Sequence, residues 1–349
     1  MPERRTSVTE RVLTRRELNR AVLARQLLLE RARLPITRAL ERVAGLQTQY
    51  APSGYIGLWS RVHGFERDHL TQALERRTVV QATLMRSTIH LVPAVDYWPF
   101  AMGVRRTRRD WWLRLNKDIT ARQMEVAAER LRTFLSDGPR RATEVDRFMG
   151  TKRSGSQLWL DLVRVPPSGT WDRRRAGLYG VAEDWLGLPD TSEADGLAHL
   201  VWRYLHAFGP ASRADIASWT GVPVTPLDPV LEGLDLHRFR DEQGGVLLDV
   251  PGAPLPDAGT PAPPRFIPTW DAILLVHARR AAILPEEYRK IIFSTKKPQS
   301  MPTFMVDGRI VGAWKFEDGH VKLDPFEPLP RAARRDLEEE GERLAAFHG

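Results

Sequence analysis

The sequence predicts an α+β, helix-rich protein with three tandem winged-helix motifs and a small C-terminal β-barrel or meander. Three observations lead to this fold class. Helical periodicity gives way to an apolar ribbon in the first third of the chain, a Gly-Pro pattern then occurs twice, and two Asp-Gly turns follow a proline-rich linker. With 349 residues and 42% hydrophobic content, the chain is long enough for two or three units with their own cores.

The N-terminal region reads as helices followed by a two-stranded ribbon. Thr14 can cap a first helix whose leucines lie mostly on one face, and Pro35 opens a second helix. A short helix from Asp68 to Arg76 then precedes two apolar segments, Val79 to Met85 and Thr88 to Val92. Because this is the order of elements in a winged helix, we expect the first such motif here.

Two later passages share the pattern Gly-Pro-x4-acid-aliphatic-x2-aromatic-x-Gly. It runs from Gly138 to Gly150 and again from Gly209 to Gly221. In each passage, an amphipathic helix should end at the last glycine, and a second helix and a turn-rich wing should follow. The second helices are expected at 156–165 and 226–234, and the wings in SGTWDRRRAGLYG and HRFRDEQGGVLLDV. Gly-Pro could instead simply separate consecutive helices, but the spacing that both passages share after it favours a repeat.

The C-terminal segment follows the linker DVPGAPLPDAGTPAPPRFIP and has a different pattern. Asp307-Gly308 and Asp318-Gly319 each lie between alternating apolar residues, which is typical of β-hairpins. We therefore expect a three-stranded meander, able to close into a small barrel, before a final helix at 331–347. The expected units are residues 1–137, 138–205, 206–252 and 253–349.

The composition narrows the class of partner. There are 52 Lys and Arg against 44 Asp and Glu, a formal charge of +8, which favours nucleic acid ahead of an anionic membrane. The absence of Cys excludes disulfides, thiolate metal sites and cysteine nucleophiles, and the nine histidines do not cluster at metal-ligand spacing. We expect no metal and no cofactor. No apolar leader or stretch of ~20 apolar residues occurs, so a cytoplasmic location is expected.

Basic and polar residues gather in two places. The run VRRTRRDWWLRLNK at 104–117 would place arginines over much of one side of a helix, suitable for phosphates; a solvated helix with two core tryptophans is the alternative. On the predicted ribbon, strand alternation puts Arg86, Thr88 and His90 on one face, which should line a cleft. For His90, the pattern favours a strand residue whose side chain has a hydrogen-bond partner over a general base.

Two glutamines, Gln47 and Gln49, flank Thr48 where a helix should end and a Pro-Ser-Gly turn should begin. They are neutral groups in a chain whose polar residues are mostly charged. From spacing alone, Gln47 could simply cap the helix end and Gln49 could simply be solvated.

The segments that carry these residues, GLQTQYAPSGYIGLWSR and LMRSTIHLVPAVDYW, resemble a winged-helix family of bacterial DNA glycosylases. That family includes interstrand-crosslink glycosylases and the self-resistance glycosylases of azinomycin producers. The resemblance continues through PPSGTW, VAEDWLG, YLHAFGPASRADIASWTG and PTFMVDGRIVGAWKF, so it spans nearly the whole chain. It implies three winged helices and a β-barrel around a C-shaped basic channel that holds a Gln-x-Gln motif.

This sequence matches that motif at Gln47-Thr48-Gln49, in the form associated with the self-resistance branch. It departs from the family in two places. The middle residue is usually apolar but is Thr48 here, and the segment that often reads H-x-D-R is His277-Ala278-Arg279-Arg280.

The resemblance implies a monofunctional DNA glycosylase that hydrolyses the N-glycosidic bond of N7-alkylguanine or N3-alkyladenine adducts, with interstrand crosslinks as further candidate substrates. Gln47 and Gln49 are then the catalytic residues, and a monomer is expected to bind double-stranded DNA. The alternatives are a non-enzymatic winged-helix regulator and an RNA-binding protein. The candidate DNA contacts are Arg61, Arg86, Thr88, His90, Arg105, Arg106, Arg108, Arg109, Lys296 and Lys297.

Overall fold

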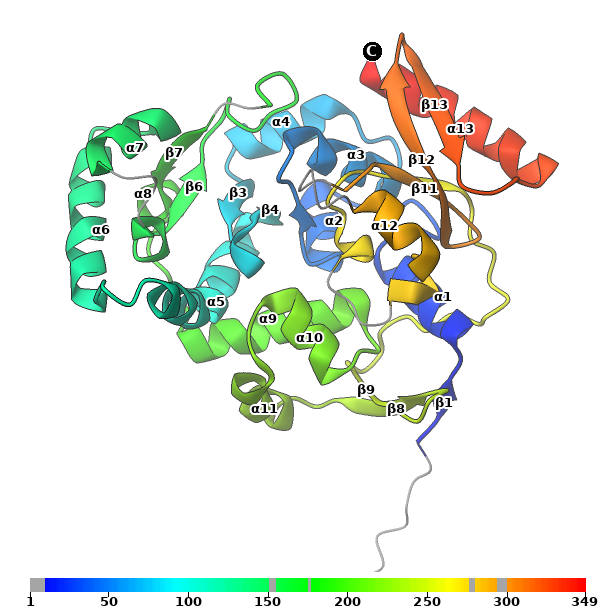
Figure 1. Ribbon diagram of the computed structural model, residues 1–349, viewed down its shortest axis with the longest axis horizontal. Helices are drawn as coiled ribbons and strands as arrows, with labels where there is room; N and C mark the ends of the chain where they lie inside the picture. Colours follow the sequence, from blue (N-terminus) through cyan, green and yellow to red (C-terminus); the bar gives the residue numbers. More distant parts are fainter. Residues whose placement is uncertain (1–9, 151–154, 175–176, 276–279, 294–299) are drawn as a thin grey trace, which may run out of the picture.

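The structure is a computed structural model that describes residues 10–150, 155–174, 177–275, 280–293 and 300–349. It is mixed α+β and helix-rich, as predicted (Figure 1). Helices α6 (Ala121–Leu135) and α7 (Ala142–Met149) lie at one end of the long axis, and α13 (Arg331–His348) lies at the other. None of the helices in the described ranges has both the length and the apolar character that crossing a membrane requires.

The N-terminal region contains the predicted helices and ribbon. The Thr14 hydroxyl accepts a hydrogen bond from the Glu17 backbone N at 3.1 Å, and the Glu17 carboxylate accepts from Thr14 N at 2.8 Å, so a capping box begins α1. The helix ends before the run of leucines does, because Leu27 has φ 57°. The elements are β1 (Val12–Leu13), α1 (Arg15–Arg25), α2 (Ile36–Arg42), β2 (Leu46–Gln47), α3 (Ala51–Arg61), α4 (Arg67–Glu75), β3 (Val79–Thr83), η1 (Met85–Ser87) and β4 (Ile89–Pro93).

The Pro-Ser-Gly segment after the glutamines does not form the predicted turn. It is the first turn of α3, where Pro52 is tolerated because the first backbone N–H groups of a helix need no intrahelical acceptor. A Cβ at Gly54 would lie only 2.8 Å from Cγ2 of Thr48. The small residue thus lets α3 start directly against the glutamine motif.

One six-stranded antiparallel sheet joins the first and second regions in the order β2-β4-β3-β6-β7-β5. The helix predicted at 156–165 is wrong, because only the short η2 precedes a strand there. Val163 pairs with Ala82 on one side and Gly180 on the other, and Pro166-Pro167 could not continue a helix. The elements are β5 (Arg140–Arg141), η2 (Ser156–Leu158), β6 (Leu162–Arg164), β7 (Leu178–Val181) and α8 (Ala182–Leu186).

The segment expected to form the first of the two wings packs back against the N-terminal region. Trp171 is 5% exposed, and its ring meets that of Tyr55 edge-on with centroids 5.6 Å apart. The Gln81 side chain also donates to the Gly169 carbonyl at 2.9 Å. The start of this stretch, up to Trp171, therefore does not project freely from the molecule.

Helices α5 (Ala94–Leu115) and α9 (Glu193–Phe208) cross where two glycines meet. A Cβ on Gly103 would lie 2.7 Å from the carbonyl O of Gly196, so the crossing leaves no room for a side chain there. Phe100 and Tyr204 pack beside this crossing in the largest apolar core. The crossing therefore holds the second and third regions to the first.

The third region follows α9 in the predicted order, with α10 (Arg213–Thr220), α11 (Val224–Gly233), β8 (His237–Asp241) and β9 (Val246–Asp249). Both predicted C-caps are confirmed, because Gly150 and Gly221 adopt φ 72° and 78° after α7 and α10. The β8–β9 hairpin is confirmed too, and β1 pairs with β8 in parallel. Helix α9 runs across residue 205, where a unit boundary was expected. The assignment of three winged helices and the division into units stay predictions.

The C-terminal sheet is an antiparallel meander in the order β10-β11-β12-β13. Both predicted Asp-Gly turns connect hairpins, and the final helix is confirmed. Among the described strands, β10 and β13 are edges of an open sheet, so closure into a barrel stays a prediction. The elements are β10 (Arg265–Ile267), η3 (Ala272–Leu274), η4 (Arg280–Ala282), η5 (Glu286–Tyr288), α12 (Arg289–Ile292), β11 (Thr303–Val306), β12 (Arg309–Glu317) and β13 (His320–Pro325).

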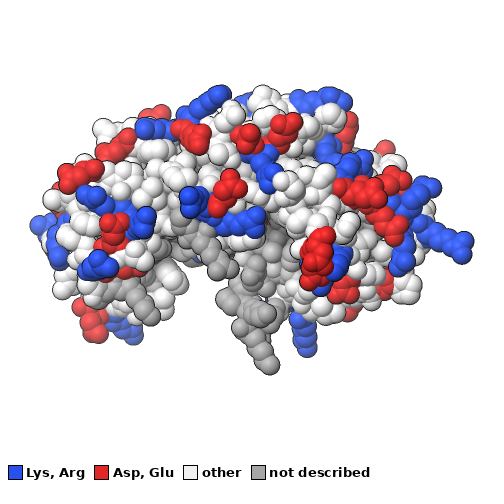
Figure 2. Space-filling view, turned by 90° about the horizontal axis from the view of Figure 1, so that it is seen from above, with Lys and Arg blue, Asp and Glu red and all other residues white. Residues whose placement is uncertain are grey.

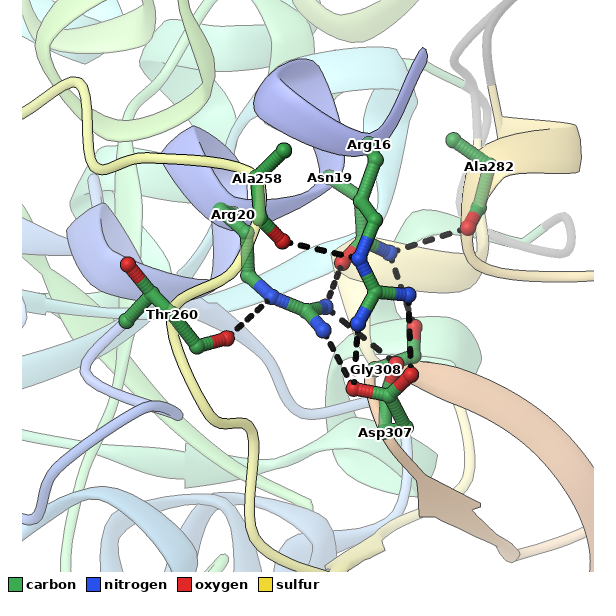
Figure 3. A network of polar contacts seen from close by, with 8 residues as sticks. All are labelled: Arg16, Asn19, Arg20, Ala258, Thr260, Ala282, Asp307 and Gly308. Atoms are coloured by element: carbon green, nitrogen blue, oxygen red, sulfur yellow. Dashed lines mark hydrogen bonds and ion pairs between the residues drawn. The ribbon is translucent and has the colours of Figure 1, made fainter.

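Helix α1 holds the first turn of this sheet (Figure 3). Arg16 donates to both carboxylate oxygens of Asp307 at 2.9 and 3.1 Å, and the buried Arg20 also pairs with that carboxylate. The Asn19 amide donates to the Gly308 carbonyl at 2.9 Å. The N-terminal helix and the C-terminal sheet are thereby fixed to each other.

Candidate active site

The glutamine motif lies beside the tip of the β3–β4 hairpin. Gln47 is the last residue of β2, at one edge of the six-stranded sheet, and it pairs with His90 of β4. Just beyond the strand, Thr48 N donates to the Ile89 carbonyl at 2.8 Å. Gln49 follows in an irregular turn before α3. The backbone thus places both amides next to the same hairpin.

Gln47 is 4% exposed, and its side-chain carbonyl is held by an arginine. Its Oε1 accepts a hydrogen bond from Arg86 Nη2 at 2.8 Å. Its Nε2 has no hydrogen-bond partner among the described residues, and this atom is not completely shielded from solvent. One lone pair of Oε1 also remains for another donor, because a carbonyl oxygen accepts twice.

Gln49 is exposed, and the backbone holds its side chain. Its Oε1 accepts from the Ile89 backbone N at 2.9 Å. Between the glutamines, Thr48 is fully buried, with its methyl group toward Gly54 and no described partner for its hydroxyl. Thr48 therefore occupies an interior position, which explains why an apolar residue would suit it.

Arg86 lies in the hairpin turn and not on a strand, with φ 52° and ψ 21°. Its Nη1 donates to the Trp219 carbonyl at the end of α10, and burial lowers its pKa to about 10. It remains charged at neutral pH. Thr88 is half-buried and its hydroxyl donates to the Met85 carbonyl at 3.1 Å. The predicted common face of Arg86, Thr88 and His90 is therefore interrupted by the turn.

His90 is a buried, neutral residue under the motif. Its Nδ1 lies 2.9 Å from the Thr88 carbonyl and so donates to it, while Nε2 is buried with no described partner. Burial and the nearby charges of Arg86 and Arg108 lower the pKa of His90 to about 3. This environment agrees with a strand residue and does not suit a general acid.

Comparison with known proteins gives the family of the chain. The family model described as "DNA glycosylase AlkZ-like" matches residues 40–347. The chain belongs to the AlkZ-like DNA glycosylase family. It is therefore an enzyme, a DNA glycosylase, and the non-enzymatic alternative is set aside.

One curated relative and one solved structure show how far the likeness extends. The interstrand DNA cross-link repair glycosylase of Streptomyces sahachiroi is 23% identical to the chain over 94% of both proteins. The solved structure of the S. sahachiroi DNA glycosylase AlkZ superposes with a TM-score of 0.80 at 17% identity and covers 97% of each chain. This AlkZ-like glycosylase therefore shares the fold of AlkZ along nearly its whole length.

The basic run of this glycosylase is helical, but most of its arginines contact protein groups. Arg105 pairs with Asp161 at 2.5 Å, Arg108 donates to the Thr83 carbonyl at 2.9 Å, and Arg109 donates to the Leu158 carbonyl at 2.9 Å. Of the four arginines proposed as DNA contacts here, only Arg106 is fully exposed. The periodicity predicts the helix correctly but does not reveal that α5 is packed on several sides.

Three further residues were predicted to contact DNA, namely Arg61, Lys296 and Lys297. Arg61 is 0% exposed and pairs with Asp271 at 2.9 Å, so its prediction as a DNA contact is wrong, as it is for the buried Arg108. Lys296, Lys297 and His277 to Arg279 lie outside the described residues.

Two backbone groups that shape the site could not be predicted from any sequence pattern. Trp219 contributes a backbone carbonyl, which no side-chain motif can indicate, although the residue is the aromatic position of the repeated pattern. Ile89 contributes a backbone N–H to Gln49. In the described part of the chain, no group of three His, Asp or Glu side chains could hold a metal ion.

Proposed function

We propose that this DNA glycosylase hydrolyses the N-glycosidic bond of purines that carry bulky alkyl groups at N7 of guanine or N3 of adenine. Gln47 and Gln49 are the proposed catalytic residues. The observation that carries the proposal is the pair of amides at one hairpin tip, one fixed by Arg86 and the other by the Ile89 backbone. The nearby His90 is neutral, so the site suits a reaction that needs no general acid.

Such a substrate supplies its own activation. Alkylation at N7 or N3 leaves the purine cationic, so no proton has to be donated to the leaving base. Water adds to C1′ and loses a proton to solvent, while the electrons of the broken C1′–N9 bond return to the purine and cancel its charge. The enzyme has to orient the water and stabilise positive charge on the sugar, and positioning alone can supply several kcal/mol, with ~7–11 as the favourable limit.

The two amides suit these tasks. Each carbonyl uses one lone pair on a protein donor and keeps a second for a water proton, and its dipole favours positive charge on the sugar. None of the described groups that hydrogen-bond to the glutamines is a lysine, which favours a monofunctional enzyme without a lyase step.

We propose that a monomer binds double-stranded DNA in the cytoplasm, in a basic channel lined by winged helices. The helix and hairpin order of the third region supports this, and Figure 2 shows lysines and arginines spread over this face of the molecule among acidic side chains. Exposed basic residues also continue along and beyond α5 at Arg106, Arg114 and Lys117. Because the curated relative is named for cross-link repair, we include interstrand crosslinks among the substrates, in repair or in self-resistance to an alkylating natural product.

The test measures release of 7-methylguanine from a duplex, with a crosslinked duplex as a second substrate. Gln47→Ala and Gln49→Ala should each lower the single-turnover rate by about 10²- to 10³-fold, the usual effect of removing one preorganised polar group. The control is Gln243→Ala in the exposed β8–β9 turn, which should keep the wild-type rate. No release by the wild-type enzyme, or wild-type release by the double glutamine variant, would contradict the proposal.

A further inference from the structure

We infer that Arg86 is a positioning residue for Gln47, which it locks in one amide orientation and ties to helix α10. This inference rests on the proposed function of the glutamine motif. It changes the role of Arg86 from the predicted DNA contact to an internal clamp, and it connects the third region of the chain to the reaction.

The guanidinium of Arg86 spans two acceptors from distant parts of the chain. Nη2 donates to Oε1 of Gln47 at 2.8 Å, and Nη1 donates to the carbonyl of Trp219. Since an arginine fork offers donors in fixed geometry, both acceptors are held at once. These two bonds use two of the five guanidinium N–H donors and hold Arg86 against protein groups.

Helix α10 fixes the other end of this clamp. Trp219 is 1% exposed and packs in the core with Phe100 and Tyr204, so its carbonyl has little freedom. The helix then ends at Gly221, where a Cβ would lie 3.3 Å from both Cγ and N of Arg86. The end of α10 therefore packs directly against the stem of Arg86.

The hairpin backbone is shaped to present this side chain. Arg86 and Ser87 have φ 52° and 58°, a left-handed conformation that residues other than glycine rarely adopt. Such conformations persist where surrounding contacts hold them, and they are found at functional sites. Here the contacts to Gln47 and Trp219 are what the unusual turn makes possible.

The consequence concerns the orientation of the Gln47 amide. The last torsion of a glutamine side chain is broad and roughly two-fold, so carbonyl and NH2 can exchange places at small cost. Arg86 is a donor only, and it selects the orientation with Oε1 toward itself and Nε2 away. Without Arg86, Gln47 would sample both orientations, and a water or sugar would meet the wrong group part of the time.

The experiment separates catalysis from DNA binding. Single-turnover release of 7-methylguanine at saturating enzyme gives the rate, and fluorescence anisotropy of the same duplex gives the dissociation constant. Arg86→Met should lower the rate by about 10²-fold, as expected for a misplaced catalytic group, and leave the dissociation constant unchanged. Arg86→Lys should recover part of the rate, because it restores a donor. The matched control, Arg335→Met on the exposed side of α13, should leave both the saturated rate and the dissociation constant unchanged.

A double-mutant cycle decides whether Arg86 acts through Gln47. In the Gln47→Ala background, Arg86→Met should lower the rate no further, because the group that it orients is already absent. An equal fold-loss in both backgrounds, or a weaker dissociation constant with a wild-type rate, would overturn the inference. Failure of the wild-type enzyme to release any base would instead overturn the proposed function. Arg86→Lys keeps the charge and most of the stem, so the cycle can be run with it where Arg86→Met is poorly folded.

Discussion

His90 illustrates, at the scale of a residue, how burial decides which form of a side chain the enzyme holds. The unfolded chain takes up a proton at this ring as the pH falls through about 6.5, whereas burial, with Arg86 and Arg108 nearby, lowers the pKa in the folded protein to about 3. Between these values acid favours the unfolded state. The full contribution of neutral His90 to stability is thus present above pH 6.5 and is lost progressively below it.

We predict that His90 accounts for about 2 kcal/mol of the stability lost between pH 7 and pH 5, at 1.36 kcal/mol per pKa unit. His90→Asn retains a donor for the Thr88 carbonyl but cannot take up a proton, so its stability should fall by that much less over the same interval. Urea denaturation of both proteins at the two pH values provides the comparison. Equal losses in wild type and variant would show that His90 titrates normally in the folded protein.

The residue scale also shows which side chains the sequence could identify. The Gln-x-Gln motif could be found because the resemblance singled it out, whereas the role of Arg86 depends on a turn and on a carbonyl from α10. Arg61 was predicted to contact DNA. Its partner Asp271 is distant in sequence, and α3 is buried along its whole length, which no local pattern reveals.

At the scale of elements, local chemistry predicted the ends of helices and the turns of hairpins. The Asp-Gly turns and the glycine C-caps have strong backbone preferences of their own, so they were correct. β6 was missed because its short apolar run fits a helix or a buried strand equally well. Pairing with β3, which is distant in sequence, and with β7 makes it a strand. A turn was predicted where α3 begins, because Pro and Gly are common turn residues.

The crossing of α5 and α9 depends on the absence of side chains at two glycines. We predict that Gly103→Ala and Gly196→Ala will each lower the free energy of unfolding by about 1–3 kcal/mol, the usual cost of overpacking. The reason is that a Cβ at either position would lie 2.6–2.7 Å from backbone oxygen of the facing helix. The measurement is urea denaturation followed by circular dichroism.

Gly233→Ala is the matched control for the two crossing variants. Gly233 ends α11, and a Cβ there meets no atom within 4 Å. The substitution should be neutral or stabilise by up to about 1 kcal/mol, because alanine loses less backbone entropy in a helix. Equal effects at Gly103 and Gly233 would mean that helix propensity, and not close packing, explains the glycines.

At the scale of the whole molecule, α1 connects regions that lie far apart in the sequence. Arg25 forms two hydrogen bonds with the Asp249 carboxylate of β9 at 2.6 and 2.8 Å, and both side chains are buried. From the same helix, Arg16 and Arg20 hold Asp307 of the C-terminal sheet (Figure 3). One N-terminal helix thus binds both the third region and the meander, which the sequence alone presents as separate units.

We predict that Arg25→Met will lower the stability of the whole chain and not of one region. Removing one partner leaves Asp249 buried without its counter-charge, which typically costs about 3–5 kcal/mol. Because α1 joins two regions, unfolding followed by tryptophan fluorescence and by circular dichroism should give coincident transitions that shift together in the variant. Arg335→Met, which removes an exposed arginine on α13, should shift neither by more than about 0.5 kcal/mol. Two separate transitions, with only one of them moved by Arg25→Met, would show that the third region and the meander unfold independently despite their shared helix.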